Sequence, residues 1–293
     1  MFREIWKDVQ TQIRLGTVWT RVIVLCVIVF VVINILKSYF TFTNDGIPSE
    51  VYRNILEKVS LSGILMNNLI FPWVWITHIF VHEGFFHLLW NMIFLYWVSQ
   101  IVDDLIGKNH SIYIFFEGAI IGGIFFMVST LILPWYDSSA IAYGASAAVT
   151  ALLFAAATIA PDYSIRFLLI GNVSLKYVAL VVLLLDLLFA FQNSNSGGHF
   201  AHLGGAFMGW LYIVLLRQGV KMNFLEGVKL SASSRQSKNV KGKIRNLPPR
   251  EISQDKRKIL EENELDKILE KIKKSGLQSL TSAERAFLDS KSK

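Results

Sequence analysis

Six long stretches of apolar residues limit what this chain can fold into more than any other feature of its sequence. A helix needs about 20 predominantly apolar residues to cross the hydrocarbon core of a bilayer. The candidate spans are residues 18–38, 85–106, 111–133, 145–161, 174–191 and 200–217. The chain is 53% hydrophobic and 17% charged, whereas a soluble domain carries about a quarter charged residues. We therefore predict an all-α polytopic membrane protein with six transmembrane helices, and a soluble enzyme is disfavoured.

A seventh apolar stretch, residues 60–84, has polar and helix-breaking residues in its middle. Asn67, Asn68 and Pro72 interrupt it, and backbone exposed to lipid must satisfy its own hydrogen bonds. Trp73 follows the proline, and indole rings favour the headgroup level of a membrane. The stretch is therefore predicted to be interfacial or re-entrant rather than a seventh span.

Charge is distributed unevenly along the chain and predicts its orientation. Residues 1–216 contain 10 basic and 12 acidic side chains, whereas residues 217–293 contain 19 and 10. Cytoplasmic segments of membrane proteins carry an excess of Lys and Arg. With six spans, the basic residues before the first span and the basic tail lie on the same side. We expect both termini to be cytoplasmic and, because no transit-like leader is evident, the host to be a prokaryotic plasma membrane.

The chain is expected to contain four segments. They are a cytoplasmic N-terminal segment (1–17), a six-helix membrane domain (18–217), a basic flexible linker (218–256) and a small cytoplasmic helical hairpin (257–293). Thr281 and Glu284 have the spacing of a capping box, which would open the second helix of the hairpin. The basic tail is expected to bind the anionic lipid headgroups of the membrane surface. Its basic residues are not interleaved with aromatic ones, which argues against nucleic-acid binding.

Several polar side chains are predicted to lie at one depth in the membrane. Spans two, four and six all run from the outer to the inner face, so their first turns lie near the outer surface. His87 and Asn91 open the second span, Ser146 opens the fourth, and His199 and His202 open the sixth. Polar and ionisable groups inside a membrane are costly and mark functional sites by default. The topology therefore makes these groups candidates for one reactive site.

Ser146 and His202 form a candidate nucleophile and base. A serine hydroxyl is a weak nucleophile unless an adjacent base removes its proton, so the fourth and sixth spans must touch. Small residues permit such close approach; they are Gly144, Ala147, Ala148, Ala151, Ala201, Gly205 and Gly209. Acyl transfer also needs donors for the oxyanion, and His87, Asn91 and the Ser146 N–H are available. Taken singly, each feature also has a structural explanation, since a serine in a helix commonly bonds a backbone carbonyl.

Three separated segments carry these residues in a specific pattern. They are His82-Glu-Gly-Phe-Phe-His87-Leu-Leu-Trp-Asn91, Gly144-Ala-Ser146-Ala and Ala201-His202-Leu-Gly-Gly205. In order, spacing and host span they resemble the His-x-x-x-Asn, Gly-x-Ser-Gly/Ala and Ala-His-x-x-Gly motifs of the rhomboid intramembrane serine proteases. The resemblance covers about residues 15–217.

The resemblance implies a fold and a role for each residue. The fold is a six-helix rhomboid-like bundle with a water-filled cavity open to the outside. Ser146 would be the nucleophile and His202 the general base and then acid, in a dyad without an acidic third member. His87, Asn91 and the Ser146 N–H would stabilise the oxyanion. Four residues would support the motifs: Gly144, Ala145, Ala147 and Gly205. No cofactor and no metal ion is implied.

The implied reaction is hydrolysis of a peptide bond in or near a transmembrane helix of a single-span or multi-span membrane protein. Loop 40–84 would correspond to the family's membrane-dipping first loop, and residues 192–199 to the mobile cap by which a substrate enters. Three positions depart from the family's usual residues. Ala147 replaces a glycine, Val74 lies where many members have a Trp-Arg pair, and Thr150 stands where many carry a tyrosine beside the histidine. Val74 and Thr150 favour an alternative, a non-catalytic rhomboid-like protein that only binds membrane helices.

Two further alternatives rest on other ionisable residues. A metalloprotease or a His-lined metal transporter would use His78, His82 and His87. The last two are five residues apart and diverge by roughly 140° on a helix, which disfavours a shared ligand face. A transporter with a proton relay would use Glu117 and Asp186, neither of which has an obvious partner in the sequence.

Overall fold

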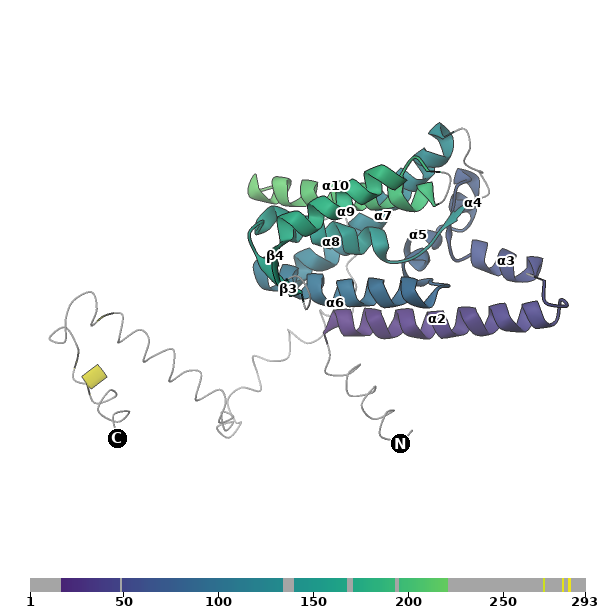
Figure 1. The fold of residues 1–293 in the computed structure, drawn as a ribbon, viewed down its shortest axis with the longest axis horizontal. Coiled ribbons are helices and arrows are strands. Elements are labelled where there is room, and N and C mark those ends of the chain that lie inside the picture. The colour runs from purple at the N-terminus through teal and green to yellow at the C-terminus, as the bar shows by residue number, and fades with distance from the viewer. Residues whose placement is uncertain are drawn as a thin grey trace, which may run out of the picture. The chain divides into compact units, whose positions relative to one another are not determined.

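The computed structural model describes residues 17–47, 49–133, 140–167, 171–192 and 195–220, together with Lys271, Thr281, Glu284 and Arg285 of the tail. The chain divides into two compact units, Met1–Val228 and Lys229–Lys293, and each is described by itself. The described part of the first unit is mainly helical, with two antiparallel pairs of short strands (Figure 1). The predicted segment 1–17 lies, except for Thr17, outside the described residues.

A helix occupies each of the six predicted spans. These helices are α2 (Val18–Phe42), α6 (Phe85–Ile106), α7 (Lys108–Ile132), α8 (Ser146–Ile159), α9 (Leu175–Phe189) and α10 (Ser196–Arg217). Among the described residues, four of them, α2, α6, α7 and α10, are long and apolar enough to cross a membrane. The helices α8 and α9 contain 14 and 15 residues, fewer than the roughly 20 that a perpendicular span needs. Four candidate spans are therefore found, and the count of six stays a prediction.

Residues 60–84 are broken into short elements, as predicted, although Asn67 and Asn68 lie inside one of the short helices rather than at a break. They form β1 (Leu61–Ser62), α4 (Leu65–Ile70), α5 (Val74–Thr77) and the 3-10 helix η1 (His78–Phe80), and α3 (Glu50–Glu57) precedes them. Strand β1 pairs antiparallel with β2 (Ile141–Ala142), while β3 (Ser164–Phe167) pairs with β4 (Gly171–Ser174). The β1–β2 pair ties the broken stretch to the segment that leads into α8.

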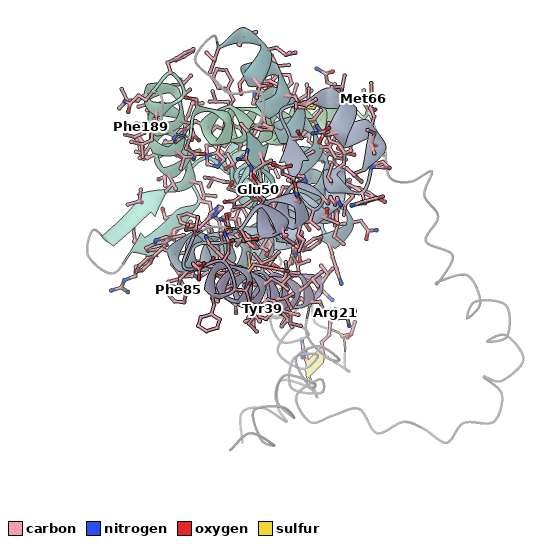
Figure 2. All side chains as sticks on the ribbon, turned by 90° about the vertical axis from the view of Figure 1, so that its right-hand side faces the viewer. Arg21, Tyr39, Glu50, Met66, Phe85 and Phe189 are labelled. Carbon is pink, nitrogen blue, oxygen red and sulfur yellow. The ribbon has the colours of Figure 1, made fainter. Side chains whose placement is uncertain are left out.

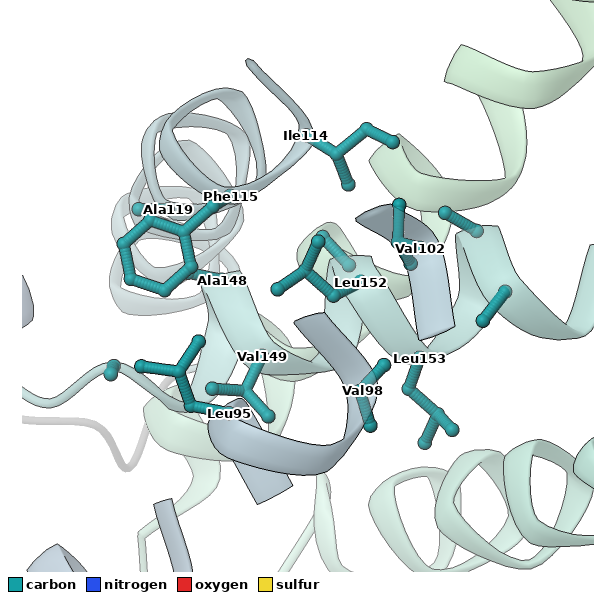
Figure 3. Packing of buried hydrophobic residues seen from close by; sticks show 14 of the residues in the cluster. Leu95, Val98, Val102, Ile114, Phe115, Ala119, Ala148, Val149, Leu152 and Leu153 are labelled. Atoms are coloured by element: carbon teal, nitrogen blue, oxygen red, sulfur yellow. The ribbon is translucent and has the colours of Figure 1, made fainter. Parts of the chain in front are cut away.

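The short helix α8 is enclosed by the other helices. It contacts α6, α7, α9 and α10, and nine of its 14 residues are buried. Figure 3 shows Leu95 and Val98 of α6, Phe115 of α7, and Val149 and Leu152 of α8 in one packed cluster. Water is not the alternative environment for membrane helices, so this packing stabilises the bundle by van der Waals contact rather than by the hydrophobic effect.

The outside of the first unit is rich in apolar side chains. Figure 2 labels Tyr39 of α2, Met66 of α4, Phe85 of α6 and Phe189 of α9, whose side chains are exposed. A soluble monomer rarely exposes contiguous apolar surface on this scale, whereas lipid tails cover such a surface without cost. The distribution supports an integral membrane protein.

Beyond Val220 the tail is described at only four positions, so the predicted linker and hairpin lie largely outside the described residues. The predicted capping box is present. The Thr281 N–H donates to a Glu284 carboxylate oxygen at 2.7 Å, and the Glu284 N–H donates to the Thr281 hydroxyl at 3.4 Å. Lys271 Nζ lies 2.8 Å from the same carboxylate, which links two positions thirteen residues apart.

Candidate active site

The candidate site residues converge on one cavity of the first unit. A cavity of about 620 Å³ is bounded by α6, α8, α9 and α10. Its polar wall consists of His87, Asn91, Tyr143, Ser146, Thr150, Asp186, Asn195, His199 and His202. The apolar wall consists of Phe86, Trp90, Phe94, Val149, Leu153, Val182, Leu185 and Phe189. The convergence of the first turns of α6, α8 and α10, expected from topology, is therefore found.

Ser146 is the first residue of α8 and borders a second cavity as well. This smaller space, of about 320 Å³, is lined by Leu61, His78, Tyr143, Gly144 and Ala201 among others, and shares Ser146 and His87 with the larger one. The first N–H groups of a helix have no partner within the helix. The Ser146 N–H is therefore suited to bind a negative oxygen in these cavities.

Helices α8 and α10, which carry Ser146 and His202, pack backbone against backbone. A Cβ atom added to Gly205 would lie 2.1 Å from the Ala147 carbonyl oxygen, and one added to Gly209 would lie 2.0 Å from that of Ala151. No side chain fits at either position. The predicted seam of small residues between the fourth and sixth spans is thus confirmed.

Helix α7 contributes to the same seam, a contact that was not predicted from the sequence. A Cβ atom at Gly118 would lie 2.3 Å from Ala151 Cβ, and one at Gly122 would lie 2.8 Å from the Ala201 carbonyl oxygen. The sequence does contain a pattern that could have predicted this contact, because Gly118 and Gly122 form a Gly-x-x-x-Gly motif, which permits close helix contact. Helices α7, α8 and α10 therefore form the rigid support of the site.

The turn before Ser146 depends on Gly144 and His82. Gly144 has a positive φ of 116°, and a Cβ atom there would lie 2.9 Å from His87 Nε2, so glycine is required. The Ala145 N–H donates to His82 Nε2 at 3.3 Å, and His82 Nδ1 donates to the Phe80 carbonyl at 3.3 Å. Burial, with the nearby charge of His87, lowers the pKa of His82 to about 4. The neutral His82 ring can therefore accept from this turn, a supporting role that its position in the first motif did not reveal.

His87 and Asn91 stack along the first turns of α6. Asn91 Nδ2 donates to the His87 carbonyl oxygen at 2.8 Å, and the His87 and His82 rings lie 5.0 Å apart between centroids. A side-chain amide carries two N–H groups. Asn91 therefore retains a donor for the cavity after bonding its own helix.

Asp186 joins the site from α9, although no partner for it was evident in the sequence. Its Oδ1 atom lies 2.8 Å from Nδ1 of His199 and 2.8 Å from Nδ1 of His202. The expectation that this carboxylate lacks a partner is wrong, because α9 packs against α10 and presents Asp186 to two histidines one turn apart. Among the residues that the structure describes, Ser146 and His202 share the cavity without a hydrogen bond between them.

The histidines of the proposed metal alternative are otherwise engaged. His78 Nδ1 lies 2.7 Å from the Val74 carbonyl oxygen, and His82 Nε2 accepts from Ala145. Within the described ranges, the three side chains that could share a metal ion are instead Asp186, His199 and His202. A metal site built on His78, His82 and His87 therefore finds no support.

Part of the predicted mobile cap is helical. Helix α10 begins at Ser196, four residues before the predicted span, so residues 196–199 form its first turn rather than a loop. Asn195 precedes it with a positive φ of 56° and lines both cavities. The small, flexible residues of Ser196-Gly-Gly-His199 obscured this helical turn in the sequence.

Glu83 connects α2, α3 and the segment before α8 at the rim of the site. One carboxylate oxygen accepts from Lys37 Nζ at 2.9 Å and from Tyr52 OH at 2.6 Å, and the other accepts from Tyr143 OH. Burial raises the pKa of Glu83, but the hydrogen bonds from Tyr143, Tyr52 and Lys37 outweigh burial and hold the pKa below its ordinary value. Tyr143 lies two residues before Ala145, so this cluster also braces the turn before Ser146.

The Glu83 cluster predicts a pH dependence of stability. A carboxyl group with a lowered folded pKa stabilises the fold above its unfolded pKa of about 4.3, and this contribution is lost as the pH falls through the folded pKa. We expect Glu83→Gln to lower the unfolding midpoint at pH 7 by about 5 °C. Thermal unfolding in detergent between pH 7 and pH 3 measures the effect. The variant should lose less stability than the wild type over this range, and parallel curves would contradict the assignment.

Two family models and one curated relative match the chain. The model described as "Rhomboid domain" matches residues 72–219, and one described as "Family of unknown function (DUF6576)" matches residues 254–293. The "Rhomboid protease GluP" of Bacillus subtilis (strain 168) is 25% identical over 181 residues. That alignment covers 61% of this chain but only 32% of the relative, so the chain matches about a third of that protein's length.

Proposed function

The chain belongs to the rhomboid family, and from this premise we propose that it is an intramembrane serine endopeptidase. It hydrolyses peptide bonds in or near the transmembrane helices of single-span or multi-span membrane proteins. The observation that carries the proposal is the meeting of Ser146, His202, His87 and Asn91 in one cavity. These four groups come from three helices, and their combination has no use in packing alone.

Acylation would start with attack of Ser146 Oγ on the substrate carbonyl carbon. The hydroxyl proton passes to His202 Nε2, because Nδ1 of that ring is engaged with Asp186. The oxyanion receives hydrogen bonds from the Ser146 N–H at the start of α8, from His87 and from the second N–H of Asn91. His202 then donates its proton to the leaving amine, and a water molecule hydrolyses the acyl enzyme by the reverse sequence of proton transfers.

The apolar wall of the cavity suits a membrane-embedded substrate. Aromatic residues of α6 and aliphatic residues of α8 and α9 form most of it, among them Phe86, Trp90, Val182 and Leu185. A helical peptide hides its carbonyl groups in its own hydrogen bonds, so the substrate must be locally unwound at the cleaved bond. The motif residues Gly144, Ala145, Ala147 and Gly205 hold the nucleophile and the base in place.

The remaining features complete the proposal. All six helices cross a prokaryotic plasma membrane, with both termini in the cytoplasm. The basic linker and the small helical hairpin of residues 218–293 lie at the inner leaflet, attracted to anionic lipids. No metal ion, cofactor or nucleic acid takes part.

Covalent labelling with a fluorophosphonate tests the proposal, because the reagent reacts only with an activated serine. The wild type in detergent should be labelled at one site, Ser146→Ala should not, and His202→Ala should react at least about 100-fold more slowly. Ser99→Ala is the matched control, since this buried serine of α6 only donates to the Tyr96 carbonyl oxygen. A folded wild-type protein that resists labelling would identify a non-catalytic helix-binding relative, which the absence of a tyrosine at Thr150 favours.

A further inference from the structure

We propose that Asp186 is a positioning residue for His202, so that the reacting unit is a serine–histidine–aspartate triad rather than a dyad. The inference rests on the proposed function and deepens it. Asp186 lies in the last turn of α9, is 5% exposed, and borders the cavity that contains Ser146. A carboxylate at this depth is costly unless a specific interaction compensates for its desolvation.

The hydrogen bonds of Asp186 determine which nitrogen of His202 carries the proton. Asp186 Oδ1 lies 2.8 Å from His202 Nδ1, and an ionised carboxylate only accepts hydrogen bonds. The hydrogen of the neutral ring must therefore be on Nδ1. This leaves the lone pair on Nε2, which is the atom that must take the proton of Ser146.

Asp186 also compensates the charge that appears during the reaction. When Nε2 of His202 takes the serine proton, the ring becomes a cation in a partly buried cavity. His87 faces the same ring from α6 and would repel that cation if protonated, so it offers no compensation. The carboxylate of Asp186 is in direct contact and attracts the cation strongly there.

A second histidine holds the carboxylate in place. His199 lies one turn before His202 on α10, and its Nδ1 is also 2.8 Å from Asp186 Oδ1. The His199 ring packs against Phe189 of α9 with 5.7 Å between ring centroids. Asp186 therefore joins α9 to α10 at two points, and the carboxylate cannot rotate away from His202 without losing both donors.

Among the residues that the structure describes, Asp186 is the one side chain that hydrogen-bonds His202. Thr150, one turn after Ser146 on α8, lines the cavity, and among the described residues it makes no hydrogen bond to the histidine. The orientation of the general base therefore depends on a residue of α9 rather than on the helix that carries the nucleophile.

The test is the kinetics of the full-length Asp186→Asn variant with a single-span substrate in proteoliposomes. We expect kcat to fall by about 10² to 10⁴-fold, with KM within about threefold of the wild type. Asp103→Asn is the matched control, because Asp103 is a carboxylate of α6 that lies outside the cavity. It accepts a hydrogen bond from Trp19 Nε1 at 3.0 Å. Its kcat should stay within about threefold. Asp186→Glu, which keeps the charge, should recover part of the lost rate.

A spectroscopic readout separates positioning from a purely structural role. In ¹⁵N-histidine NMR spectra, His202 should carry its hydrogen on Nδ1 in the wild type and should lose this preference in Asp186→Asn. His199→Ala keeps the bond from Asp186 to His202 and should cost less kcat than Asp186→Asn. An equal or larger loss in His199→Ala would show that the carboxylate serves His199 and would overturn the proposal.

Three further results would also overturn it. They are a wild-type kcat in Asp186→Asn, an unchanged His202 tautomer in that variant, and one zinc ion bound per chain that is lost in Asp186→Asn. Zinc at Asp186, His199 and His202 would replace the hydrogens on both Nδ1 atoms. Failure of the proposed function itself has a different signature, because Ser146→Ala would then cleave as fast as the wild type.

Discussion

Cleavage of a single-span substrate in membranes is expected to stop when Ser146 is replaced by alanine. Removing the nucleophile of a serine hydrolase lowers the rate by about 10⁴-fold or more, which puts the product below detection. His202→Ala should give a loss of similar size, because the serine hydroxyl then has no base. The two losses should not add in the double variant, since both residues serve one step. Quantitative immunoblotting of cleaved and intact substrate measures all three variants.

Control variants separate this loss of chemistry from a loss of folding. Ser99→Ala removes a buried hydroxyl from α6 and should cleave like the wild type. Ser146→Ala should keep the wild-type unfolding midpoint, because the Ser146 hydroxyl makes no hydrogen bond within the part of the chain that the structure describes. Activity that persists in Ser146→Ala would exclude a serine mechanism at this site.

The second large effect is expected at Gly205, where an added methyl group would separate the nucleophile from the base. In Gly205→Ala the new Cβ would start 2.1 Å from the Ala147 carbonyl oxygen, far inside van der Waals contact. Backbone atoms cannot rotate away, so α8 and α10 must move apart. Overpacking commonly costs about 1 to 3 kcal/mol, and a clash with backbone lies at or above the upper end of that range. The separation also moves His202 from Ser146, and we expect at least about 100-fold less cleavage.

Unfolding midpoints and cleavage rates should both be measured for this variant. Gly84→Ala is the matched control, because its Cβ would lie 3.6 Å from His87 Cβ, an ordinary contact. This control should change stability and cleavage little, although it lies directly before α6. If Gly205→Ala were as stable and as active as the wild type, the close contact of α8 with α10 would be wrong.

The sequence predicted the helices well because each depends on a local property. A run of apolar residues is enough to predict a helix in a membrane, and all six predicted runs are helical. The break after α4 was equally local, since Pro72 cannot continue a helix, whereas Asn67 and Asn68 lie within α4 and do not interrupt it. The boundaries were less accurate, as the start of α10 at Ser196 shows. Ser196-Gly-Gly has a low helix propensity, and contacts with the rest of the fold overrode it.

The sequence was also sufficient to identify the main residues of the candidate site, but not the contacts between them. Ser146, His202, His87 and Asn91 were identified by residue type, depth and motif, and they line one cavity. The supporting roles of His82, Gly122 and Asp186 were missed. Each of them acts through a contact with a segment distant in sequence, to Ala145, Ala201 and His202 respectively.

The sequence by itself therefore determined which segments are helical and which reactive residues line one cavity, whereas the count of six spans stays a prediction because α8 and α9 are short. The tertiary structure decided which side chains meet. In a soluble protein the apolar face of a helix shows which side is buried, but a membrane helix is apolar all round. Rotation and tilt of the helices are set instead by close packing, as at Gly205 and Gly209. For this reason Asp186 had no partner in the sequence, whereas in the folded chain it lies against both His199 and His202.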